Sequence, residues 1–170
     1  FWTINKSRYN IMKKILFFIV LLTSASYAQE HHFKAERKEV TWQLAFKTDD
    51  PEILKKIDKN HTKLIVNYDN STGKGMKMNC DCKGGGWYFE QAFDIDFEVE
   101  IKDSKYLVTV SSILFESESE TNPKTPVENY FLRIGQNVFH TTEKNKINMM
   151  CLNTYFTKLF QIPNAEITIW

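Results

Sequence analysis

Three cysteines are the residues of this chain with the clearest chemical potential. Cys80 and Cys82 are separated by one residue, and Cys151 lies far downstream. A bond between Cys80 and Cys82 would be strained in an extended segment. A bridge from either of them to Cys151 is geometrically reasonable, but Cys151 also suits a buried position as a free, small apolar residue. The three cysteines are therefore candidates for a disulfide or for redox chemistry, and the sequence leaves the pairing open.

The same thiols could bind zinc together with His61 or His140. Structural zinc ligands usually arrive in pairs whose members are separated by two to four residues. A pair separated by one residue, with scattered partners, matches this pattern poorly. We therefore predict no metal and no cofactor.

A run of glycines follows the first two cysteines. Gly84, Gly85 and Gly86 stand directly before Trp87. Their amides could surround an anion, but no helix start and no lysine-serine pair follow at the spacing of a phosphate-binding loop. Glycine commonly just permits a turn, so we expect a flexible hairpin loop. Gly84, Gly85, Gly86 and Trp87 together are the candidate binding loop of the chain.

Acidic and apolar residues alternate from Phe93 to Ile101, with an acid at every second position. Neighbouring acids on one strand face lie about 7 Å apart, which gives at most a loose cation site or carboxylate pair. We expect a solvated sheet face on which lysines such as Lys74 or Lys77 oppose the acids. The chain also has no Gly-x-Ser-x-Gly elbow, and its histidines stand in no recognisable relation to a nucleophile, so we predict a protein that is not an enzyme.

The alternating stretch is also the strongest structural signal. Its period of two predicts a strand with one buried face. The run from Tyr106 to Phe115 is rich in β-branched and aromatic residues, and four polar residues join the two runs. This pattern predicts an antiparallel hairpin.

The remaining patterns place other elements around this hairpin. Val40 to Phe46 alternates like a strand, and Pro51 to Asn60 has helical spacing behind Asp49 or Asp50 as a cap. Ile147, Met150, Cys151, Tyr155 and Leu159 recur at spacings of three and four and predict a buried stripe on a final helix. The other expectations are strands at 63–68 and 75–80, an exposed mobile loop at 116–126, a helix or strand at 127–140, the final helix at 143–161 and an extended tail at 167–170.

Residues 12–28 have the composition of a secretory signal peptide. Two lysines precede an apolar core, and small residues lead up to Ala28. The core is much shorter than the roughly 20 residues that span a bilayer, and no later stretch is longer, so we predict no integral membrane segment after cleavage. Residues 1–11 precede Met12 and indicate an artefact of start assignment. We expect a flexible lead-in at 29–39 and one domain at 40–170, exported to the periplasm or secreted.

The charge of the mature chain limits its partners. Cleavage would remove four cations and no acid, so the formal net charge falls from +1 to −3. A mildly acidic domain argues against a nucleic-acid partner. Two functions remain: a non-catalytic envelope binding or accessory domain that contacts a protein, glycan or lipid, and alternatively a cysteine-based redox or metal-binding protein centred on Cys80 and Cys82. The oligomeric state is open.

Residues Tyr68–Gly75 and the hairpin from Phe93 to Tyr106 resemble a family of exported bacterial domains of unknown function with a TATA-binding-protein-like (TBP-like) fold. The resemblance covers about residues 40–116. It implies an α+β fold, with a single curved antiparallel sheet of about five strands and two helices on one face. It implies no catalytic residues. The fold does not by itself confer DNA binding, because function lies in sites and not in the fold. In this chain the sheet bears acids where a DNA-binding saddle needs lysine and arginine.

Overall fold

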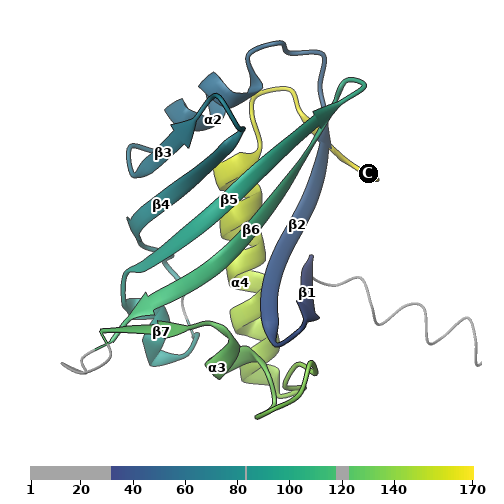
Figure 1. Cartoon of the computed structure of the whole chain (residues 1–170). Helices are drawn as coiled ribbons and strands as arrows, with labels where there is room; N and C mark the ends of the chain where they lie inside the picture. The colour runs from purple at the N-terminus through teal and green to yellow at the C-terminus, as the bar shows by residue number, and fades with distance from the viewer. Residues whose placement is uncertain (1–31, 83, 118–122) are drawn as a thin grey trace, which may run out of the picture. The chain divides into compact units, whose positions relative to one another are not determined.

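The predicted hairpin is the centre of the fold in the computed structural model, which describes residues 32–82, 84–117 and 123–170. β5 spans Phe93–Lys102 and pairs antiparallel with β6, Lys105–Glu116 (Figure 1). The Asp103–Ser104 turn between them has two positive φ angles, as in a two-residue type I′ turn. The alternation is confirmed from Phe93 to Val99, because the side chains of Phe93, Ile95, Phe97 and Val99 are buried, whereas Ile101 at the end of the hairpin is 49% exposed.

One antiparallel sheet of eight strands contains this hairpin within the described residues. Six strands lie in the order β1-β2-β6-β5-β4-β3, while β7 pairs with β6 and β8 with β2. The predicted number of about five strands was too low, because β1, β7 and β8 have only three or four residues each and such runs are too short to show a period. The other strands are β1 (Phe33–Glu36), β2 (Glu39–Lys47), β3 (Leu64–Asn67), β4 (Thr72–Met78), β7 (Lys124–Pro126) and β8 (Glu166–Thr168).

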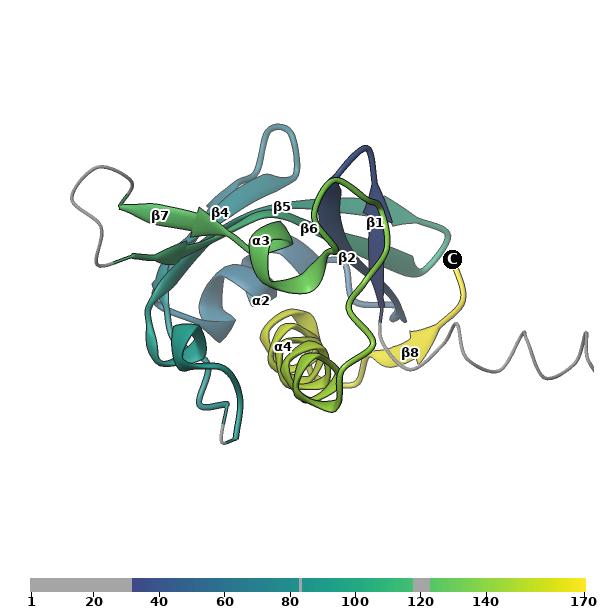
Figure 2. The same cartoon turned by 90° about the horizontal axis from the view of Figure 1, so that it is seen from below.

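Three α-helices lie on one face of the curved sheet, as Figure 2 shows. They are α2 (Ile53–Asn60), α3 (Glu128–Phe131) and α4 (Glu143–Phe160), and a 3-10 helix, η1, spans Trp87–Glu90. The α+β class is confirmed, but α3 was not counted among the two expected helices. It begins in the stretch 127–140, which the sequence left undecided because four residues show no helical period.

The buried face of α4 differs from the predicted stripe. Ile147 and Met150 were expected in the core, yet their side chains are 45% and 55% exposed. Asn148 takes a core position instead. Because α4 carries apolar residues around most of its circumference, its spacing alone could not fix which side meets the sheet. The buried residues of α4 are Asn145, Asn148, Met149, Leu152, Phe156, Leu159 and Phe160.

The segment expected as a flexible lead-in, 29–39, contains a strand. Phe33 of β1 pairs with Trp42 of β2 and is buried against Phe131 and Phe156. A single buried aromatic ring in a polar segment gave no periodic signal. The expected signal peptide at 12–28 and artefact at 1–11 lie outside the described residues. In the part of the chain that the structure covers, no helix has the length and apolar character needed to cross a bilayer.

Asp94 has a structural role that the alternating pattern did not reveal. One carboxylate oxygen accepts a hydrogen bond from the main-chain N–H of Lys77 at 2.8 Å, and the other pairs with Lys124. The pairing of β5 with both of its neighbours shifts register beside this residue, and Lys77 and Ser112 have positive φ angles there. The Asp94 side chain therefore connects β5 to β4 and to β7, next to two β-bulges.

Asp94→Asn is expected to lower the free energy of unfolding by about 1–2 kcal/mol, because it weakens charge-assisted hydrogen bonds. Burial favours the neutral carboxyl, but the bonds from Lys124 and Lys77 outweigh it and lower the pKa of Asp94. This contribution is therefore complete above the unfolded-state pKa of about 4 and is lost as the pH falls through the folded-state value. Urea titrations from pH 6 to pH 2.5 measure it.

Asp96→Asn is the matched control. The Asp96 side chain is 46% exposed, and its carboxylate lies 3.4 Å from the Lys74 ammonium. Its removal should change stability by less than about 0.5 kcal/mol. Equal effects of the two substitutions would show that Asp94 has no special role at the bulges.

Candidate functional site

A disulfide joins Cys82 to Cys151 and ties the glycine-containing loop to α4. The two Cα atoms lie 5.8 Å apart, within the usual range for a disulfide. Among the alternatives that the sequence left open, the structure has the bridge to Cys151, and the partner is Cys82. Cys151 is half-buried rather than part of a closed core stripe.

Cys80 remains a free thiol and is only 5% exposed. Burial raises the pKa of Cys80 to about 12, and the nearby charge of Asp81 adds to the effect. Since the thiolate is the reactive form of cysteine, this thiol is a poor nucleophile at neutral pH. The Cys80–Cys82 pair on which the redox alternative depended is thus divided between a buried thiol and a disulfide.

The native protein is expected to show no rapidly reacting thiol with 5,5′-dithiobis(2-nitrobenzoate) at pH 8. The same sample in guanidinium chloride should show one thiol, because Cys80 becomes exposed while the disulfide stays intact. Reduction in denaturant should raise the number to the three cysteines of the sequence. A fast reaction in the native state would contradict a buried Cys80.

The residues considered for zinc do not converge. Cys82 and Cys151 share a disulfide and so lack the thiolates that zinc requires. His61 follows α2, where its Nδ1 accepts a hydrogen bond from the Lys63 main chain, while His140 precedes α4. Among the described residues there is no group of three or more histidine, cysteine, aspartate or glutamate side chains placed to hold a metal ion.

Asn148 of α4 makes two buried hydrogen bonds to the glycine-containing loop and the residues that follow it. Its Oδ1 accepts a hydrogen bond from the Gly86 main-chain N–H at 3.0 Å, and its Nδ2 donates to the Tyr88 hydroxyl at 2.5 Å. The Gly86 amide is therefore not available to an anion. A Cβ on Gly85 would lie 3.1 Å from the Asn148 side chain, so the loop also needs a small residue there. Asn148 and the Cys82–Cys151 disulfide thus both contact the loop.

Aromatic rings continue from this anchor to the surface. The Tyr88 and Tyr130 rings are stacked with centroids 3.7 Å apart and an interplanar angle of 8°. Trp87 makes edge contacts with both of them and remains 57% exposed. Burial raises the pKa of Tyr88 to about 12, the neighbouring Tyr130 adds to the effect, and Asn148 opposes it. Trp87 thus packs edge-on against the stacked rings of Tyr88 and Tyr130.

A groove of about 530 Å³ runs between α4 and the segment that precedes the disulfide. Cys80 and the half-buried Tyr155 contribute to its lining, and Met150 is an exposed apolar side chain at its edge. We call it the α4 groove. Its lining residues are Asn79, Cys80, Asp81, Met150, Cys151, Thr154, Tyr155 and Lys158.

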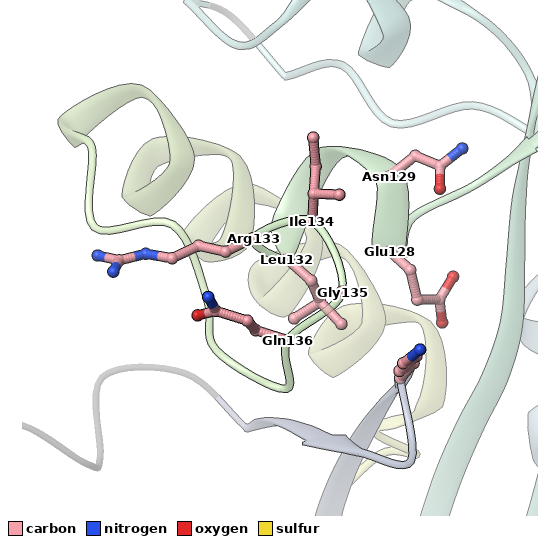
Figure 3. A pocket seen from close by; sticks show the side chains of 8 residues that line it. Glu128, Asn129, Leu132, Arg133, Ile134, Gly135 and Gln136 are labelled. Carbon is pink, nitrogen blue, oxygen red and sulfur yellow. The ribbon is translucent and has the colours of Figure 1, made fainter.

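Further hollows lie elsewhere on the described surface. One, of about 410 Å³, lies beside α3, and Figure 3 shows that the Arg133 and Glu128 side chains on it extend away from each other. Glu128 also accepts a hydrogen bond from the Val40 main chain. Another, of about 540 Å³, lies over the open face of the sheet, where Lys74 pairs with Asp96. That pair confirms the expected lysine beside the acidic row, whereas Lys77 contributes its main-chain N–H.

The sequence pattern predicted the loop and the cysteines as candidate site residues, but it did not predict the residues that contact them. Asn148, Tyr130 and Met150 were not identified as parts of a site. The one available signal was Asn145 and Asn148 at a helical spacing of three, followed by Leu152 four residues on. Two asparagines on one side of an otherwise apolar helix suggest buried hydrogen bonds.

Comparisons with known proteins place this geometry in context. No protein-family model matches the chain, and a search of curated proteins finds no significant match. Among solved structures, the chain is similar to a TBP-like protein from Parabacteroides distasonis ATCC 8503, with 13% sequence identity and a TM-score of 0.48. The similarity covers 74% of this chain and 92% of the other.

Proposed function

We propose that this chain is an exported, non-catalytic binding or accessory domain of the cell envelope. Its partner contacts the surface formed by residues 79–82 and 84–91 and by the outward side of α4, which we call the loop–helix face. The observation that supports this proposal is the exposure of Trp87 on a loop anchored by a disulfide and by Asn148.

An exposed tryptophan that packs edge-on against two tyrosine rings is better explained by binding than by folding. Tryptophan is among the residues that contribute most to interfaces, because its ring buries a large area when a partner covers it. The fixed loop lowers the entropic cost of that contact, since little chain has to be ordered on binding. The exposed Met150 extends the apolar surface along α4.

The redox or metal alternative has less support. Its thiol pair is divided, the remaining thiol is buried, and the raised pKa of Cys80 suppresses the thiolate. A structural disulfide is typical of exported domains. The thiol titration described above also tests this alternative.

Site-specific photo-cross-linking in the producing cells tests the proposed function. p-Benzoylphenylalanine replaces Trp87 in one variant and Glu98, on the open face of the sheet, in the control. We expect an adduct with a protein, glycan or lipid from position 87 and a much weaker one from position 98. Equal labelling, or no adduct from position 87, would contradict the proposal.

A further inference from the structure

Three lysines form a row across neighbouring strands at the end of the β5–β6 hairpin. Lys47 of β2 is the register partner of Lys105 of β6, and Lys105 is the register partner of Lys102 of β5. Residues paired in this way have their side chains on the same face of the sheet, on strands about 4.8 Å apart. That face is the open one, because Phe46 and Tyr106, the adjacent residues of β2 and β6, are buried in the core. Like charges directly opposite one another destabilise a sheet, so an anion bound beside these lysines would stabilise the row.

The acids nearby do not pair with these lysines. Asp103 lies in the turn of the hairpin, and Glu166 of β8 is the second register partner of Lys47. Neither carboxylate forms an ion pair with any of the three lysines, and none of the ion pairs among the described residues involves them. Lys47 and Lys102 are exposed, and Lys105 is half-buried. The three cations thus outnumber the two acids and are available to an anionic ligand.

A hollow of about 320 Å³ adjoins the row, and its lining residues are Lys102, Asp103, Lys105 and Trp170. The Lys105 ammonium donates a hydrogen bond to the Ile169 carbonyl at 3.1 Å, which leaves two of its N–H groups for a ligand. In Figures 1 and 2 the C-terminus lies at the same end of the sheet as the turn between β5 and β6. The Trp170 side chain is 44% exposed. The hollow therefore combines two ammonium groups with an aromatic ring that a ligand can reach.

The two ammonium groups and the indole determine the class of ligand. Lysine binds phosphate as a point charge. A phosphomonoester carries a charge of about −1.5 to −2 at pH 7 and three acceptor oxygens, so it can contact both ammonium groups at once. A carboxylate has only one charge to share between them. The indole offers a large apolar surface to the organic group of the ester.

We propose that this hollow binds a phosphomonoester, with the phosphate between Lys102 and Lys105 and the organic group against Trp170. Lys47 adds to the positive potential at the edge of the site. The site does not rest on the proposed function, because none of its residues belongs to the loop–helix face. The same phosphate chemistry occurs in soluble sugar phosphates and in the headgroup of phosphatidic acid, and the experiment separates these two sources.

The test is titration of the isotope-labelled full chain, followed by two-dimensional NMR, with glucose 6-phosphate, inorganic phosphate and glucose. Glucose 6-phosphate should shift the amide signals of residues 102–105 and the indole signal of Trp170. It should bind more tightly than inorganic phosphate, and glucose should not bind. The double variant Lys102→Gln/Lys105→Gln should lower the affinity for both phosphates about tenfold. Trp170→Ala should weaken the binding of glucose 6-phosphate and leave that of inorganic phosphate unchanged.

The control is Lys144→Gln/Lys158→Gln on α4. It removes the same charge from two exposed positions outside the hollow and should leave both affinities unchanged. Vesicles of phosphatidic acid in phosphatidylcholine are tested in parallel. Co-sedimentation that Lys102→Gln/Lys105→Gln abolishes would assign the phosphate to a lipid headgroup, and binding of glucose 6-phosphate without co-sedimentation would assign it to a soluble ester.

Equal losses in the two double variants would overturn the inference, because net charge alone would then explain the binding. So would NMR shifts that lie outside residues 102–105 and 170, glucose binding as tightly as its phosphate, or no binding by either phosphate or by the vesicles. An unchanged affinity of Trp170→Ala for glucose 6-phosphate would remove the indole from the site and overturn the proposal as stated. Circular dichroism verifies that each variant is folded.

Discussion

Replacing both Cys82 and Cys151 with serine is expected to lower the free energy of unfolding by about 4 kcal/mol. The bridge spans 69 residues of sequence, and closing a loop of that length removes a large part of the freedom of the unfolded chain. The bridge also connects the loop to α4, which crosses the whole sheet in Figure 1. Urea unfolding curves measure the change as a shift of the midpoint at constant slope.

Dithiothreitol provides the control for this prediction. It should lower the midpoint of the natural sequence and leave that of the double serine variant unchanged, because only the former has a disulfide to reduce. If the reductant has no effect on the natural sequence, or shifts both midpoints equally, the bridge does not contribute to stability.

Asn148→Ala should lower the free energy of unfolding by about 2–4 kcal/mol. The substitution leaves the Gly86 N–H and the Tyr88 hydroxyl without their partners in a buried setting, and each such loss costs about 1–3 kcal/mol. The loop should also loosen, so the amide hydrogens of residues 84–91 should exchange faster with solvent. Urea titration and hydrogen-deuterium exchange measure the two effects.

Thr154→Ala is the matched control on the same helix. Its hydroxyl is exposed and bonds only the Met150 carbonyl one turn earlier in α4. The change should stay within about 0.5 kcal/mol. Loop exchange rates that stay unchanged in Asn148→Ala would show that the disulfide alone fixes the loop.

Local patterns predicted the parts of the fold that bury a regular face. Phe93 to Ile101 alternates over nine residues, and its apolar positions are buried as expected up to Val99, while Ile101 beside the turn is exposed. The final helix was predicted within one residue of its observed end, and Thr142 accepts a hydrogen bond from the Asn145 main chain as one of the two expected caps. In these elements one long periodic signal suffices, because burial of one face determines the conformation.

Short elements and pairings depended on contacts that local sequence does not encode. β1, β7 and β8 exist because an edge of β2 or β6 is available to them. In the sequence pattern Asp94 is one acid of a solvated row. Its hydrogen bond from Lys77 and its ion pair with Lys124 depend on where β4 and β7 lie in the folded chain. The side of α4 that faces the sheet was likewise decided by packing.

The sequence by itself determined the α+β class, the central hairpin, the final helix and the three cysteines from which one bridge had to be chosen. Tertiary structure decided that Cys82 forms this bridge, that Cys80 is enclosed, and that Asn148 holds the loop beneath Trp87. The physical reason is that periodicity reports whether a segment has a buried face. The partner of a thiol, an amide or an aromatic ring depends on segments that only folding brings together.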